Sequence, residues 1–282
     1  MKKTIALLIA VVISVGNLFA QTASWKNSRH SVYLGGGFNW FVGDFDRVEG
    51  GSKTFSPKLL KETSYSFDLG YKYKLTERFS LRFSVLYSKL TGDDTKSKDD
   101  THKKRGLIFK SNSFDFGANI DFFFIKEKEV HKPNFWQRWS AYAFVGLGLL
   151  TYSPRWDGPT VGTVKNGDKL RDLHTETESY KPVAMSLPIG LGLNCLITKK
   201  IYLGVEWALR FTTSDHIDDL HGDYNFETQG AKDINFANAV QGSKRGGDEH
   251  QDWYSTLLFH VGYKFKNSDG GDVHFYHRPK YY

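Results

Sequence analysis

The residues with the clearest chemical potential stand together at 214–223, inside a long polar segment. Ser214, Asp215 and His216 supply a hydroxyl, a carboxylate and an imidazole within three positions. Such groups act as nucleophile, orienting group and general base when the fold brings them together. Their linear spacing does not establish that geometry, and polar residues beside a strand are usually solvated or paired locally. We therefore predict no catalytic residue, and an enzyme using Ser214, Asp215 or His216 stays as the alternative.

Two groups of acidic residues have the right chemistry for a divalent cation, because carboxylates are preferred ligands of hard cations. Neither group has the spacing of a defined calcium loop, and the ten histidines show no ligand-type pairing. The sequence thus predicts no metal site and no cofactor. The two groups are Asp218, Asp219 and Asp223, and Asp93 and Asp94 with Asp99 and Asp100.

The elements that must position these residues are strands, because apolar side chains recur at every second position. Between Tyr65 and Leu75 this alternation is strict over eleven residues. At about 3.3 Å per residue, such a strand crosses a tilted bilayer, whereas a helix would scatter the same side chains around its circumference. The alternation resumes from Phe79 to Tyr87 after the three residues 76–78, which predicts an antiparallel hairpin.

Six further runs bring the predicted number of strands to eight. Four alternate clearly, whereas 32–44 contains three consecutive glycines and 141–152 is apolar on both faces. Short or medium links alternate with long polar segments, as in membrane barrels with short periplasmic turns and long outer loops. The sequence predicts an all-β, eight-stranded antiparallel up-and-down transmembrane β-barrel. The clear runs are 114–124, 185–193, 201–211 and 253–265, the links are 76–78, 125–139 and 197–200, and the long segments are 45–64, 91–106, 153–183 and 213–251.

The polar face of these strands should point into the lumen. A barrel of eight strands has an interior just wide enough for side chains, so these residues predict a solid plug rather than a pore. A soluble β-sandwich would instead need a dry core between two sheets. Cys195 lies on the apolar face and is expected to act as a small lipid-facing hydrophobe. The predicted inward residues are Asp68, Lys72, Arg82, Asp115, Asn119, Asp121, Glu206, Arg210 and Lys264.

The chain divides into three parts. Lys2 and Lys3, an apolar run and Ala20 predict that 1–20 is a secretory signal peptide. Residues 21–266 form the barrel, and 267–282 form a flexible periplasmic tail. This organisation predicts a place in the outer membrane, in contact with its lipid. The net charge of +7 comes without any nucleic-acid-binding motif, so we expect no nucleic-acid partner.

Eight segments carry a family pattern through their order along the chain: 43–44, 90–94, 142–148, 152–155, 187–192, 204–207, 218–219 and 252–254. In this order they resemble the PorG-like barrels of the Bacteroidota, outer-membrane components of the type IX secretion system. The resemblance covers most of the chain after the predicted signal peptide, and departs from the family pattern at 214–217 and in the basic tail. It implies a non-enzymatic barrel that associates with a periplasmic secretion ring, made of a lipoprotein and its partner protein.

The leading functional hypothesis is a barrel that anchors or organises a protein complex, for which the resemblance implies the type IX secretion machinery. It depends on the filled lumen, the long loops and the paired carboxylates at loop entrances. A lipid- or envelope-modifying enzyme and a passive adhesion or envelope-integrity barrel remain as alternatives.

Overall fold

The computed structural model describes residues 28–42, 63–96, 106–126, 138–177, 179–235, 242–245 and 251–265. The predicted signal peptide and the predicted tail lie outside these ranges. Within the described ranges, no helix is long and apolar enough to cross a membrane.

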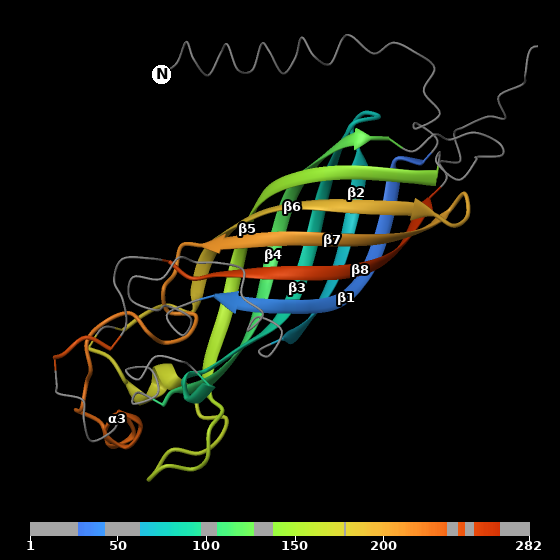
Figure 1. The fold of residues 1–282 in the computed structure, drawn as a ribbon. Helices are drawn as coiled ribbons and strands as arrows, with labels where there is room; N and C mark the ends of the chain where they lie inside the picture. The colour runs from blue at the N-terminus through green and yellow to red at the C-terminus, as the bar shows by residue number, and fades with distance from the viewer. Residues whose placement is uncertain are drawn as a thin grey trace, which may run out of the picture.

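Eight antiparallel strands close into one barrel in which each strand pairs with its neighbours along the chain and β1 pairs with β8 (Figure 1). The predicted fold and strand number are confirmed. The strands are β1 (His30–Val42), β2 (Ser64–Lys74), β3 (Phe79–Asp93), β4 (Ile108–Ile125), β5 (Trp139–Trp156), β6 (Val183–Leu196), β7 (Ile201–Thr212) and β8 (Trp253–Phe265).

Three strands extend well beyond the predicted runs, at their ends nearest the long loops. β3 continues to Asp93, β4 begins at Ile108 and β5 continues to Trp156. Their pairing continues there although the outward side chains have become polar, as at Lys89 and Lys110. Apolar alternation marks only the membrane-crossing part of a strand, so the sequence predicted these three strands to be shorter than they are.

The two faces of the barrel are reversed relative to those of a soluble protein. Outward side chains are apolar and exposed, with Leu34 at 62% and Leu147 at 59%, whereas the inward Arg82 is 1% exposed. A closed barrel leaves no unpaired edge, so with an apolar outer belt it is suited to span a bilayer. All nine predicted inward residues are buried, and Cys195 lies partly exposed on the outer side.

The two ends of the barrel differ. The β2–β3 and β6–β7 turns lie at one end, and the long loops with the short helix α3 (Gln229–Ile234) lie at the other (Figure 1). Two 3-10 turns, η3 (Asp94–Lys96) and η5 (Leu170–Leu173), belong to the loop end. By the usual topology of such barrels, the turns face the periplasm and the loops face outward.

Glycines in the strands make room for inward-facing tyrosine rings. The ring of Tyr33 on β1 lies over Gly70 on β2, and the ring of Tyr142 on β5 lies over Gly192 on β6. A Cβ atom at either glycine would overlap the ring, which explains why glycine occupies inward positions of these strands.

Candidate functional site

The middle of the lumen is crossed by a network of ion pairs centred on Arg82 of β3. Its guanidinium pairs with Glu206 on the opposite wall and with Asp121 at 3.1 Å. Lys72 lies 3.4 Å from Asp121, and the Tyr142 hydroxyl donates to Glu206 at 2.9 Å. Five strands thus contribute side chains to one buried layer, which occupies the cross-section of the barrel.

A second layer lies around Asp115 of β4. Arg210 Nη1 donates to its carboxylate at 2.8 Å, as does the Ser186 hydroxyl at 2.8 Å, and the Tyr254 hydroxyl lies at 3.3 Å. The buried charges of the described strand residues balance, because four carboxylates face four cations. The predicted polar plug is therefore confirmed in its residues and in its mixed sign. These charges are Asp68, Asp115, Asp121 and Glu206 against Lys72, Arg82, Arg210 and Lys264.

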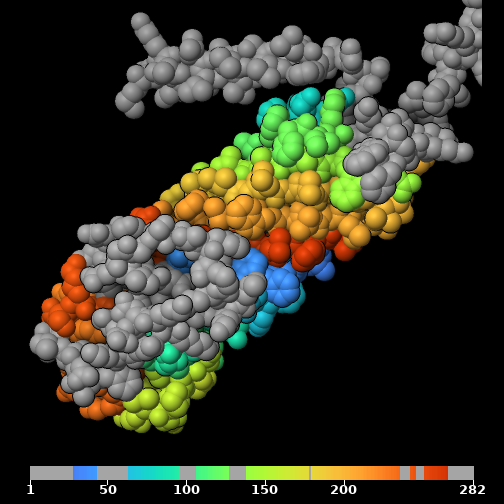
Figure 2. All heavy atoms as spheres, in the orientation of Figure 1, coloured from blue at the N-terminus to red at the C-terminus, as the bar shows by residue number. Residues whose placement is uncertain are grey.

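Toward the loop end the interior changes from polar to apolar. Leu86, Leu150 and Leu258 point inward from the strands and pack in one core with Ile217 and Leu220 from the loop after β7. The described loop residues 157–177, 179–182, 213–235 and 242–245, here called the outer cap, thus fold onto the barrel mouth (Figure 2). The buried leucine and isoleucine side chains of these loops supply a core at the barrel mouth.

Two buried carboxylates, Asp219 and Glu176, share Arg245 and organise the outer cap. Asp219 accepts from the Thr175 hydroxyl at 2.6 Å and the Tyr180 hydroxyl at 2.7 Å, and it pairs with Arg245 at 3.2 Å. Arg245 also pairs with Glu176 at 3.1 Å. Asp219 has a φ of 64°, a left-handed conformation held by these contacts.

Burial and neighbouring charges shift the pKa values of Glu176, Tyr180 and Arg245. It raises the pKa of Glu176 above its ordinary value, although Arg245 opposes the shift. Burial, and then the Asp219 charge, raises the pKa of Tyr180. Burial lowers the pKa of Arg245, but Asp219 and Glu176 outweigh it and raise the pKa overall. Arg245 is therefore a permanently charged centre that links distant parts of the cap.

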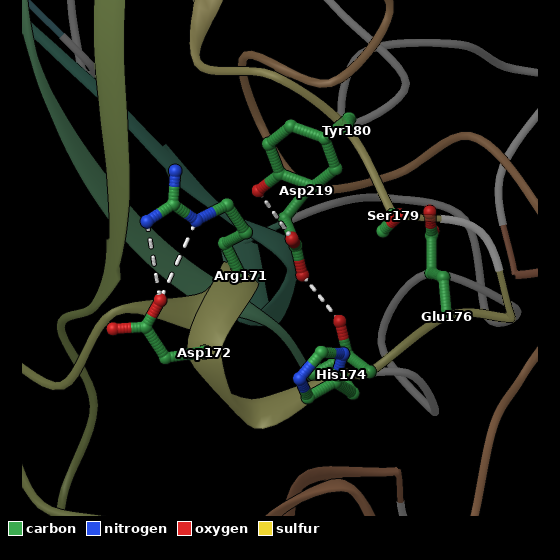
Figure 3. Close-up of a pocket in the computed structure, with 8 residues that line it drawn as sticks. Arg171, Asp172, His174, Glu176, Ser179, Tyr180 and Asp219 are labelled. Atoms are coloured by element: carbon green, nitrogen blue, oxygen red, sulfur yellow. Dashed lines mark hydrogen bonds and ion pairs between the residues drawn. The ribbon is translucent and has the colours of Figure 1, made fainter.

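A cavity of about 220 Å³ opens beside this pair. In Figure 3 the Asp219 carboxylate lies beside the Tyr180 hydroxyl; its second donor is the Thr175 hydroxyl. Arg171, which also lines the cavity, pairs with Asp172 at 3.3 Å. Because the Asp219 oxygens already accept hydrogen bonds from protein donors, this carboxylate serves to hold the loops together.

The three residues singled out for catalysis line one polar cavity of about 630 Å³ at the barrel mouth. The Ser214 hydroxyl lies 2.7 Å from the Tyr152 hydroxyl, and His221 Nδ1 lies 3.1 Å from Asp215. The His216 ring stacks on Tyr180 with centroids 4.4 Å apart. The structure brings Ser214, Asp215 and His216 together, but the described contacts of Ser214 tie it to a tyrosine and to backbone.

The acidic residues considered for a metal do not converge. Asp218 accepts from the backbone N–H of Leu220 at 3.1 Å, whereas Asp219 belongs to the Arg245 cluster. Asp94 accepts from the backbone of Leu107 at 3.2 Å. In the part of the chain that the structure describes, no group of three His, Cys, Asp or Glu could hold a metal ion. Asp99 and Asp100 lie outside that part.

A family model described as a domain of unknown function, DUF6089, matches residues 6–270. The chain belongs to the DUF6089 family. No curated protein sequence matches it. Its apolar belt and closed sheet make this DUF6089 protein an outer-membrane β-barrel. The resemblance to the PorG-like barrels stays a prediction.

Solved outer-membrane proteins are similar to the DUF6089 chain. Neisserial surface protein A is 14% identical, covers 84% of this chain and 97% of its own, and has a TM-score of 0.41. Ail of Yersinia pestis, solved with the heparin analogue sucrose octasulfate, is 13% identical, covers 85% and 99%, and has a TM-score of 0.40. The outer membrane enzyme PagL is 12% identical, covers 82% and 97%, and has a TM-score of 0.34.

The DUF6089 chain also contains site residues that sequence reasoning missed. Glu176, Tyr180 and Arg245 organise the outer cap, yet none stands in a recognisable motif. Arg245 lies 69 residues from Glu176 along the chain. Only the folded loops bring them together. Isolated apolar residues such as Ile217 and Leu220 in a polar segment were the one available signal that these loops pack.

Proposed function

We propose that this chain is a non-enzymatic outer-membrane barrel that anchors or organises a protein complex, namely the type IX secretion machinery. The observation that carries the proposal is the pairing of charges across the lumen, Arg82 with Glu206 and Arg210 with Asp115. A barrel whose interior is filled in this way works through its surfaces: the turns, the outer cap and the lipid-facing wall.

The turn end supports a periplasmic protein partner. Its described turns expose five basic side chains and only one acidic side chain, Glu77. A rim with an excess of positive charge steers association with a partner of opposite sign. The resemblance described above suggests a partner, the periplasmic ring lipoprotein and the protein bound to it. The exposed basic residues are Arg78, Lys126, Arg138, Lys199 and Lys200.

Affinity purification after mild solubilisation tests this proposal. A photo-crosslinkable residue at Lys199 in the β6–β7 turn should capture ring proteins, whereas the same residue at the exposed Lys232 in α3 should not. Recovery of the barrel without ring components, and without crosslinks from position 199, would count against the proposal.

The gathering of Ser214, Asp215 and His216 in one cavity favours a second candidate, a lipid- or envelope-modifying enzyme. In that case His221, paired with Asp215, would be the general base, and Ser214 the nucleophile. Lipid profiles of a deletion strain, and of strains carrying Ser214→Ala, His216→Ala or His221→Ala, test it. An unchanged profile in the deletion strain would eliminate the enzyme.

A further inference from the structure

Four basic side chains form a row on the outer face of the barrel, directly beyond the apolar belt. This basic patch consists of Lys89 on β3, Lys110 on β4, Arg155 on β5 and Lys169 in the following loop. Lys110 pairs in register with Arg155, and Arg155 forms a β-bridge with Lys169. On the other side, Lys110 pairs with Thr91 of β3, so Lys89, two positions before Thr91, lies diagonally from it. Directly paired residues project from the same face of a sheet, so the four charges are neighbours.

The alternation of the strands directs these side chains away from the lumen. Their neighbours Leu90, Phe109 and Trp156 are buried in the interior core, so the intervening positions face outward. Lys89, Lys110 and Arg155 are half-buried against the wall, and Lys169 is exposed.

Neighbouring groups hold the patch in place and offset only part of its charge. Lys110 Nζ donates to Asp157 at 2.7 Å and to Asn166 at 3.1 Å, and Arg155 Nη1 donates to the Gly167 carbonyl at 2.9 Å. A guanidinium has five N–H donors, so one such bond orients Arg155 and leaves further donor capacity.

The acidic residues near the patch are fewer than the bases. Burial raises the pKa of Asp157, but hydrogen bonds and the charges of Lys110 and Lys89 outweigh it and lower the pKa overall. Asp93 and Asp168 lie at the edges, where they accept from Thr95 and from the Lys165 backbone. The inner part of the patch therefore contains four cations and one carboxylate.

An aromatic row lies immediately below the patch, at the end of the lipid-facing belt. The Tyr65 and Tyr87 rings lie 6.3 Å apart, and Tyr87 and Phe114 lie 5.2 Å apart. Lys89 Nζ lies 5.8 Å from the centre of the Tyr65 ring. Aromatic girdles mark the membrane interface, which puts the basic patch at the level of the outer-leaflet headgroups.

We propose that the basic patch binds the phosphate groups of a phosphorylated lipid of the outer leaflet, whose acyl chains lie along the aromatic row. Lysine and arginine are the side chains that bind phosphate, arginine through paired hydrogen bonds. A small soluble anion would contact the cations alone. The continuity of the patch with the lipid-facing row therefore selects a lipid as the occupant.

Native mass spectrometry of the full chain in detergent tests the assignment, with bis-phosphorylated lipid A and its dephosphorylated form as probes. The double variant Lys110→Gln/Arg155→Gln should lower retention of the phosphorylated lipid at least about tenfold, the loss expected for a charge-assisted hydrogen bond. The control Lys199→Gln/Lys200→Gln removes the same charge at the opposite end and should leave retention unchanged. The charge-conserving Lys110→Arg/Arg155→Lys variant should retain the lipid.

Three results would overturn the proposal. Retention by the double glutamine variant equal to that of the wild type would remove the patch as the site. Equal retention of dephosphorylated lipid would show that acyl chains alone bind. Complete displacement by inorganic phosphate at the concentration of the lipid would identify a small-anion site. Gel mobility of the heated and unheated variants checks that each barrel is folded.

Discussion

Replacement of Arg82 by methionine should strongly destabilise the barrel, although the two side chains are similar in length. Arg82 is 1% exposed and lies between the carboxylates of Asp121 and Glu206, which are equally buried. Methionine fills much of the same space but leaves both carboxylates without their shared cation. Lys72, 3.4 Å from Asp121, then remains as the neighbouring positive charge.

The magnitude follows from burial. Removal of one partner from a buried ion pair costs roughly 3–5 kcal/mol of the free energy of unfolding. The turn-end pair of Lys126 and Glu77, with side chains 43% and 44% exposed, is worth roughly 0–1 kcal/mol. Lys126→Met is therefore the matched control for Arg82→Met. Adding Glu206→Gln to Arg82→Met should recover part of the loss, because Glu206 is the carboxylate that loses its paired cation, whereas Asp121 keeps Lys72 nearby.

Equilibrium unfolding in urea, followed by tryptophan fluorescence of the protein in lipid vesicles, measures these differences. A loss below about 1 kcal/mol for Arg82→Met, equal to that of the exposed control, would refute the reasoning. It would mean that water hydrates the lumen and that the charges are not packed into a plug.

Other substitutions test the packing and the outer cap. Gly70→Ala should cost about 1–3 kcal/mol of unfolding free energy because its Cβ would overlap the Tyr33 ring, whereas Gly36→Ala makes only an ordinary contact and should be tolerated. Thr228→Ala removes the N-cap of α3, whose hydroxyl accepts from Ala231 at 3.0 Å, and should increase proteolysis of the cap. Below pH 4.5, the ordinary pKa of the group, the raised pKa of Glu176 contributes stability to the folded cap, and this stability is lost as pH rises through the pKa of the folded state. Proteolysis of the cap should therefore rise with pH more steeply in the wild type than in Glu176→Gln.

The barrel could be predicted from the sequence because lipid and lumen impose opposite demands on alternate residues. Tyr65 to Leu75 satisfies them so strictly that strand and face follow together. The outer parts of β3 to β5 could not be predicted in this way. There Lys89, Lys110 and Arg155 stand beyond the apolar belt, and hydrogen bonding between strands continues without a hydropathy signal.

The candidate site was predictable only in part. Ser214, Asp215 and His216 are neighbours in sequence and remain neighbours in the cavity. Tyr152, which contacts Ser214, and Tyr180, which stacks on His216, come from 62 and 36 positions away along the chain. Contacts of this kind depend on how the loops pack against each other and against β5, and no local pattern encodes them.

The cross-lumen ion pairs also act as a test of correct assembly. Arg82 and Glu206 are 124 residues apart, so each charge lacks its partner until β7 reaches its place in the sheet. A slip of one residue in register turns every side chain to the opposite face, and would put these charges in contact with lipid. The native register joins them, so a barrel that closes in a slipped register is destabilised when it closes.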